Sequence, residues 1–121
     1  MSDGDDESEG SDVRAIGGLL EDEYAHAILV QTSDQELSAP ELSEACDASV
    51  STIYRRIERL QEYELLEERL QLDRDGHHYS TYTARLDRIE IELEDGEFKL
   101  DIAYREENAA DRFTDLFEGL R

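Results

Sequence analysis

Apolar residues recur at helical spacing in the first half of the chain, between stretches that are polar. Residues 16–31 show this pattern and predict a first amphipathic helix. Ser38 and Glu41 stand three residues apart, as in a capping box, and Pro40 lies in the first turn, where proline is tolerated. These residues predict a second helix that ends near Cys46.

A third helix is expected after a short turn at residues 47–48. Ser49 can cap it, and apolar side chains recur at i, i+3, i+7 and i+10 from Val50 to Leu60. A second set of side chains lies well round the helix from this apolar stripe, so we expect it to point away from the core. These side chains belong to Thr52, Arg55, Arg56 and Arg59.

A hairpin is predicted for residues 67–83, which alternate around the dipeptide Asp75-Gly76. This dipeptide favours a two-residue turn, and the turn fixes the pairing of the strands. Arg74 and His77 would then flank the tip. The expected pairs are Leu72 with Tyr79 and Leu70 with Thr81.

A second hairpin is predicted for residues 88–102, around the turn Asp95-Gly96. Its apolar side chains all fall on one face, which something must cover. Residues 108–120 have apolar positions at helical spacing and predict a C-terminal amphipathic helix that can cover this face. The expected pairs are Leu93 with Phe98, Ile91 with Leu100 and Ile89 with Ile102.

Acidic residues dominate the composition, with 33 against 12 basic residues and a net charge of −21 in 121 residues. The acids are spread along the chain and Lys99 is the only lysine, a balance typical of proteins from salt-saturated cytoplasms. We therefore infer a halophilic host. At salt near 1 M the Debye length is only about 3 Å, so this acidity does not exclude contact with DNA. Residues 50–63, with three arginines and two glutamates, are a local exception to the acidic rule.

Several classes of protein are disfavoured by what the sequence lacks. It has no run of about 18 apolar residues and no basic leader before a hydrophobic stretch, so we expect a cytoplasmic protein without membrane insertion. A lone cysteine, Cys46, cannot form an intrachain disulfide or a multi-thiolate zinc site. The carboxylates are evenly spread and no nucleophile or phosphate-binding motif appears. We therefore expect no enzyme, no cofactor and no bound metal.

The order helix, helix, short turn, helix, hairpin is that of a winged helix-turn-helix. We expect an α+β fold in which a second β-hairpin and a C-terminal amphipathic helix follow this unit. Residues 1–14 are rich in acids and poor in apolar side chains, so we expect them to form a disordered acidic tail.

The stretch from Leu37 to Leu70 resembles the DNA-binding module of ArsR-type regulators, and especially the small helix-turn-helix regulators of haloarchaea. The resemblance covers residues 20–83. Glu64 departs from it, because many family members have glycine between the recognition helix and the wing. The most specific positions are Ala39, Leu42 and Ala45, then Ser49-x-Ser51-Thr52-Ile53-Tyr54-Arg55, then Ile57-x-x-Leu60.

The resemblance implies a dimeric repressor or activator whose dimer contact lies outside the module. Residues 15–84 would form the DNA-binding domain, and residues 85–121 would complete the core and form the dimer. Only 38% of the residues are hydrophobic, so the chain has few apolar side chains to leave exposed. We therefore expect the apolar face of the second hairpin to be buried against a second copy. We expect a homodimer through the N-terminal and C-terminal helices, with the second hairpin assisting.

Such a module places its recognition helix in the major groove of double-stranded DNA and its wing near the minor groove. Arg55 has the planar fork that can bind a guanine, while Arg56 and Arg59 are placed for phosphate contact. Cations such as potassium are expected to be taken up at this interface because the protein is so acidic. The residues expected to contact DNA are Ser49, Ser51, Thr52, Tyr54, Arg55, Arg56, Arg59, Arg74 and His77.

Three alternatives stay open. The arginines of the third helix could form a solvated face that pairs with Glu58 and Glu62. Cys46 could serve as a thiol sensor in a DNA-binding regulator, which requires an exposed thiol of low pKa. The winged helix could instead dock other proteins, as an adaptor that does not bind DNA.

Overall fold

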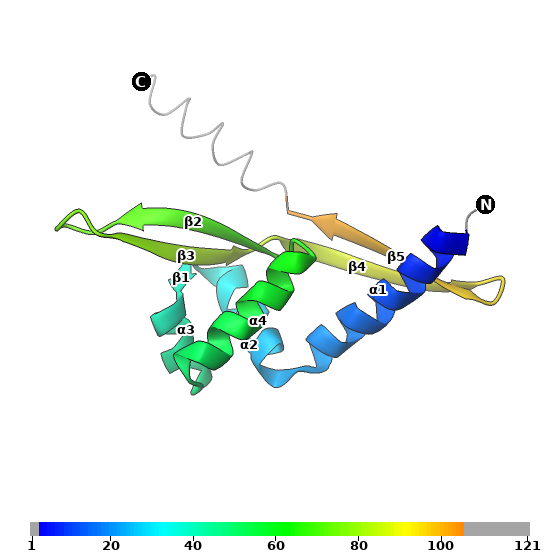
Figure 1. Ribbon diagram of the computed structural model, residues 1–121, viewed down its shortest axis with the longest axis horizontal. Helices are drawn as coiled ribbons and strands as arrows, with labels where there is room; N and C mark the ends of the chain where they lie inside the picture. The colour runs from blue at the N-terminus through cyan, green and yellow to red at the C-terminus, as the bar shows by residue number, and fades with distance from the viewer. Residues whose placement is uncertain (1–2, 106–121) are drawn as a thin grey trace, which may run out of the picture.

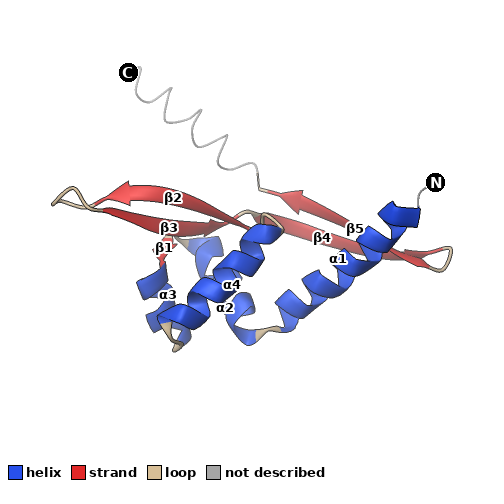
Figure 2. Cartoon of the chain, in the orientation of Figure 1, coloured by secondary structure: helices blue, strands red, loops and turns tan. Residues whose placement is uncertain are grey.

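The computed structural model describes residues 3–105, with side chains from residue 12 onward. Helices pack together in the centre, and two β-hairpins extend from them in opposite directions (Figures 1 and 2). The expected α+β fold, a helix-turn-helix with a hairpin wing, is confirmed. The elements are α1 (Asp3–Glu21), α2 (Glu23–Asp34), β1 (Leu37–Ser38), α3 (Ala39–Cys46), α4 (Val50–Glu62), β2 (Leu66–Leu72), β3 (His78–Ala84), β4 (Leu86–Glu94) and β5 (Glu97–Tyr104).

The first predicted helix is two helices in the structure. α1 ends at Glu21 and α2 begins at Glu23, and Asp22 between them has an extended backbone. The carboxylate of Asp22 accepts a hydrogen bond from the backbone N–H of Ala25 (2.8 Å), so Asp22 caps α2. The apolar spacing continues across the break, which is why the pattern alone predicts a single helix.

The N-terminal part of α1 corrects a second expectation. A disordered tail is expected for residues 1–14, but α1 begins at Asp3. Ile16 and Leu19 are fully buried and hold the end of α1 in the core. Once a helix is nucleated, each added residue gains a hydrogen bond at small cost, and the helix dipole favours acidic residues near the N-terminus.

The helices α2, α3 and α4 enclose the core. α3 begins with the predicted capping box, in which Ser38 accepts from the N–H of Glu41 (3.3 Å) and Glu41 accepts from the N–H of Ser38 (2.8 Å). Asp47 ends α3 in the left-handed conformation (φ 52°), and α4 begins at Val50. Both helices of the predicted helix-turn-helix are therefore confirmed.

The wing is the hairpin β2–β3, which β1 joins in an antiparallel sheet of order β1-β3-β2. Its pairing differs by one residue from the expected pairing. The carboxylate of Asp73 accepts hydrogen bonds from the backbone N–H groups of Asp75 (2.9 Å) and His77 (2.8 Å), which widens the loop. The observed pairs are Leu72 with His78 and Leu70 with Ser80, in place of Leu72 with Tyr79 and Leu70 with Thr81.

The hairpin β4–β5 has the predicted pairing. Asp95 and Gly96 both have positive φ (54° and 79°), as a two-residue type I′ turn requires. α1 lies along this hairpin and contacts β5, so the apolar face is half-buried near its base (Figure 1). At the tip, Ile91, Leu93 and Phe98 are 45%, 68% and 49% exposed. The helix predicted for residues 108–120 lies outside the described residues.

Candidate nucleic-acid interface

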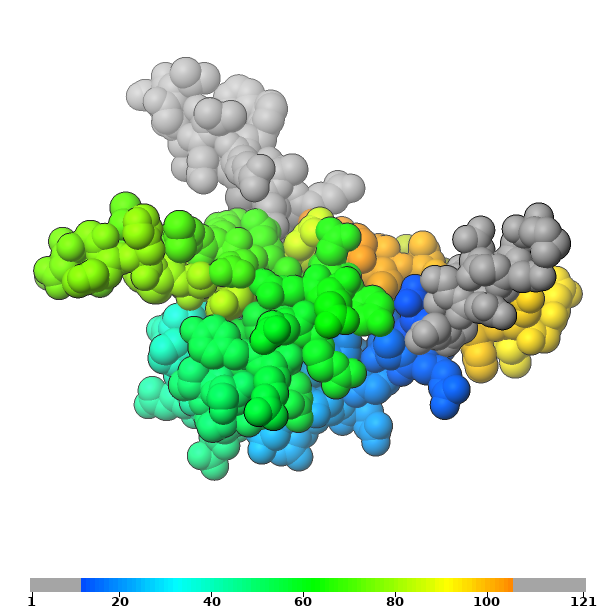
Figure 3. All heavy atoms as spheres, in the orientation of Figure 1, coloured from blue at the N-terminus to red at the C-terminus, as the bar shows by residue number. Residues whose placement is uncertain are grey.

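The helix α4 presents two different faces. Ile53, Ile57 and Leu60 lie at i, i+4 and i+7 and are buried in the core. Arg55 and Arg59 are exposed on the opposite side of the helix. Figure 3 shows α4 on the surface of the molecule, below the base of the wing. The packing of one face thus fixes two guanidinium groups on the solvent side.

Acidic neighbours do not neutralise Arg55 and Arg59. Within residues 12–105, where side chains are described, neither arginine makes an ion pair or a side-chain hydrogen bond. Glu58 and Glu62 also lie on exposed positions of α4, yet no ion pair joins them to either arginine. The alternative of a salt-bridged helix face is therefore not supported.

Arg56 differs from the other two arginines of α4. Its Nε donates to Oδ2 of Asp22 (2.9 Å), and its guanidinium carbon lies 5.6 Å from the centre of the Tyr24 ring. The side chains of Arg56 and Asp22 are only 25% and 21% exposed. The hydrogen bond from Arg56 lowers the pKa of Asp22, although burial acts in the opposite direction.

Arg56 therefore ties α4 to the N-terminus of α2. Contrary to the prediction that its side chain points away from the core, its guanidinium turns toward α2 and is only partly exposed. The sequence contains a signal for this, because Arg56 lies three residues after Ile53 and four before Leu60 and so borders the apolar stripe. Asp22 and Tyr24 were not expected at this site, although an aspartate before a helical pattern is typical of an N-cap.

Hydroxyl groups fix the N-terminus of α4. Ser49 Oγ accepts from the N–H of Thr52 (3.1 Å) and donates to Thr52 Oγ1 (2.9 Å). The hydroxyl of Ser51 lies 3.3 Å from that of Ser49. Ser49 therefore acts first as the helix cap, whereas Ser51 and Tyr54 are exposed beside the arginines. Thr52 is half-buried.

A carboxylate lies where the wing meets α4, and sequence reasoning missed it. Glu68 of β2 accepts hydrogen bonds from Oγ of Ser80 (2.6 Å) and from Nε2 of Gln61 (3.0 Å). These hydrogen bonds lower the pKa of Glu68, so it is ionised at neutral pH. Its cross-strand partner Tyr82 is buried, and burial raises the pKa of the phenol. A fixed negative charge therefore borders α4 on the side of the wing.

The tip of the wing is acidic. Arg74 and His77 are exposed there, as expected, and Nδ1 of His77 lies 3.4 Å from Oδ2 of Asp73. Asp73, Asp75 and His77 bring one potential ligand atom each within 4.8 Å of one another. All three are exposed, and Asp73 already accepts two backbone hydrogen bonds that shape the turn. The carboxylates at this tip oppose close phosphate contact by Arg74.

Cys46 lies at the end of α3, half-buried against the core. Burial raises the pKa of its thiol, which lowers the fraction of the reactive thiolate. A redox sensor requires the opposite environment, so the structure does not favour the thiol-sensing alternative.

Residues 20–69, from the last turn of α1 into β2, match the family model of a helix-turn-helix domain. A comparison with curated proteins gives no match. None of the helices within residues 3–105 combines the length and apolar content that a bilayer span needs. Together with the geometry of α3 and α4, the family match indicates a DNA-binding regulator of transcription rather than an enzyme.

Proposed function

We propose that the chain regulates transcription by placing α4 in the major groove of double-stranded DNA. One observation carries this proposal. Arg55 and Arg59 stand exposed, without an acidic partner among the described residues, in a chain whose net charge is −21. Guanidinium groups that a rigid helix holds on the solvent side of such an acidic protein are suited to bind a polyanion such as DNA.

The side chains of α4 would make different kinds of contact with DNA. Arg55 lies nearer the N-terminus of the helix and would bind a base edge, guanine being the base that matches its fork. Arg59 lies one turn further along and would contact phosphate. Ser51, Thr52 and Tyr54 would add contacts from the first turns, while Ser49 would serve mainly as the cap.

The wing would make a second, weaker contact. Arg74 and His77 are exposed at its tip and would lie beside the minor groove. Because carboxylates share this tip, we expect its contribution to affinity to be smaller than that of α4.

We also propose that the protein acts as a homodimer, as the resemblance to ArsR-type regulators implies. The exposed apolar side chains Ile91, Leu93 and Phe98 at the tip of β4–β5 support a contact with a second copy. A twofold dimer would present two copies of α4 to successive major grooves on one side of the duplex.

High salt would be a condition of this function. With a net charge of −21, the protein and DNA repel each other at low ionic strength. We propose a halophilic setting in which cations such as potassium are taken up at the interface. DNA affinity should then stay flat or rise with potassium chloride in the molar range, contrary to the steep loss seen with basic proteins.

A titration of the full chain with random-sequence duplexes in molar potassium chloride tests the proposal. The double variant Arg55→Ala/Arg59→Ala should lose binding, because both exposed guanidinium groups are removed. Arg88→Ala is the matched control, since Arg88 is also exposed (64%) but lies on β4 and pairs with Glu90. The wild type and this control should bind equally well.

Two results would contradict the proposal. If the wild type binds no duplex at any salt concentration, the adaptor alternative gains support. If the double variant binds as well as the wild type, DNA contact does not run through α4.

A further inference from the structure

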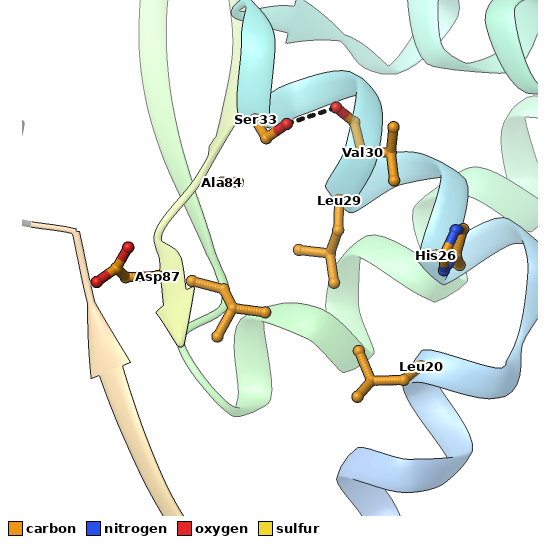
Figure 4. A pocket seen from close by; sticks show the side chains of 8 residues that line it. Leu20, His26, Leu29, Val30, Ser33, Ala84 and Asp87 are labelled. Carbon is orange, nitrogen blue, oxygen red and sulfur yellow. Dashed lines mark hydrogen bonds between the residues drawn. The ribbon is translucent and has the colours of Figure 1, made fainter. Parts of the chain in front are cut away.

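The outer side of α2 carries a groove that lies apart from the arginines of α4. It has a volume of about 270 Å³ and lies between α2 and the junction of β3 with β4 (Figure 4). Most of its lining is apolar. The apolar lining residues are Leu20, Leu29, Val30, Ala84 and Leu86.

The lining favours apolar side chains over a small polar ligand. Small-molecule sites usually occupy roughly 300–1,000 Å³, and this groove lies just below that range. Its polar lining residues are His26, Ser33 and Asp87, and the hydroxyl of Ser33 already donates to the carbonyl of Val30 (2.7 Å). Val30 is 54% exposed and Leu20 is 37% exposed, so apolar surface along this groove faces solvent among the described residues.

The described chain ends at the rim of this groove. The backbone N–H of Arg105 donates to the carbonyl of Arg85 (2.7 Å), the residue between the lining residues Ala84 and Leu86. The guanidinium of Arg105 donates to the carbonyl of Ser33 (3.1 Å), another lining residue. Residue 106 therefore follows directly from a residue anchored on both sides of the rim.

We propose that this groove binds the C-terminal segment of the same chain, residues 106–121. The segment is 16 residues long, and its apolar residues recur at i, i+4, i+7, i+8 and i+11 from Ala109 to Leu120. As a helix, residues 108–120 would extend about 20 Å, enough to follow α2, which has 12 residues. Only three residues separate Arg105 from Ala109.

The short connection favours this occupant over a second copy. A short linker gives an effective local concentration on the order of millimolar, which a separate molecule does not reach in dilute solution. The proposal changes the role expected for the C-terminal helix, which would cover α2 and leave the tip of β4–β5 open.

Tryptophan fluorescence of the full chain tests the proposal, because the protein has no native tryptophan. Phe113→Trp and Phe117→Trp, made in separate chains, should each give emission blue-shifted from that of free N-acetyltryptophanamide. Adding Val30→Glu should shift this emission to the red. Leu70→Glu is the matched control at an exposed aliphatic residue on β2, and it should leave the emission unchanged.

Since Val30 is 54% exposed, Val30→Glu should retain the fold, which circular dichroism can check. Binding within one chain predicts an emission maximum that does not change on dilution, whereas a red shift on dilution would assign the groove to a second copy. The proposal would be overturned if the Phe113→Trp and Phe117→Trp chains showed the same emission maximum as free N-acetyltryptophanamide. A red shift caused by Leu93→Glu but not by Val30→Glu would also overturn it, because the segment would then cover β4–β5.

Discussion

The two sides of α4 use the same residue type for different purposes. Arg55 is exposed and has no acidic partner among the described residues, whereas its neighbour Arg56 is bonded to Asp22 and lies over Tyr24. One residue along a helix is a rotation of about 100°, enough to turn a side chain from solvent toward a neighbouring helix. The position of an arginine relative to the apolar stripe, rather than its charge, decides whether it can meet a ligand.

The difference separates binding from stability along one helix. Arg56 and Asp22 join α4 to α2, so their loss should lower stability without removing the groups proposed to meet DNA. Arg55 and Arg59 make no comparable contact, so their loss should lower affinity without lowering stability.

Arg55→Ala should give the largest effect. If Arg55 binds a base edge, the variant should bind its selected duplex about 10- to 100-fold more weakly, a loss of roughly 1–3 kcal/mol. Its free energy of unfolding should change by no more than about 0.5 kcal/mol, because the side chain is exposed. Binding titrations and urea unfolding in molar potassium chloride measure the two quantities. Full affinity in a folded variant would remove Arg55 from the interface.

Asp22→Ala should give the opposite result. The variant loses the cap of α2 and leaves the half-buried Arg56 without its partner. Its free energy of unfolding should therefore be about 2 kcal/mol lower than that of the wild type. Urea unfolding measures this loss. Asp22→Asn is the control, because an asparagine side chain can still cap α2 but carries no charge for Arg56. A folded Asp22→Ala protein with normal stability and weakened DNA binding would reverse the roles assigned to the two sides.

Acid should weaken the Asp22–Arg56 pair. Since Arg56 lowers the pKa of Asp22 in the folded protein, the pair contributes fully above the pKa of an unfolded aspartate, about 3.9. This contribution is lost as the pH falls through the lower pKa of the folded state. The difference in unfolding free energy between wild type and Asp22→Asn should therefore shrink below about pH 4. Thermal unfolding from pH 7 to pH 2 measures it, and a constant difference would exclude an ionic contribution.

The hairpins show which part of the fold the sequence can predict. Both contain the dipeptide Asp-Gly, and at residues 95–96 it forms the expected two-residue turn. At residues 75–76 only the glycine has positive φ, because the carboxylate of Asp73 binds two backbone N–H groups and widens the loop. Residue patterns predict where a turn lies. They do not predict that a nearby carboxylate accepts hydrogen bonds from the backbone N–H groups of the turn and changes its length.

At the candidate site, too, residue patterns predict some features and miss others. Local spacing places Arg55 and Arg59 opposite the buried face of α4, and the structure has them there. The partner of Arg56 lies 34 residues away in sequence, and Glu68 meets α4 only because the wing folds back onto it. Contacts between different elements follow from packing, and the periodicity within one element does not predict them.

The C-terminal end of α4 should give the smallest effect. Glu64 has positive φ (58°), and the N–H groups of Glu64 and Leu65 donate to the carbonyls of Gln61 and Leu60 (3.0 Å each). This is a Schellman motif, whose left-handed residue is usually glycine.

Glu64→Gly should therefore raise the free energy of unfolding by about 0.5–1 kcal/mol, because glycine adopts this conformation without the cost of a side chain. The variant also loses the ion pair with Arg85 (3.3 Å), but Glu64 is 70% exposed and such pairs contribute little. Urea unfolding measures the gain, and DNA affinity should not change. Glu64→Ala is the control, since it keeps the strained backbone and removes the carboxylate. An equal gain in Glu64→Ala would show that charge repulsion, rather than backbone conformation, limits stability at this end of α4.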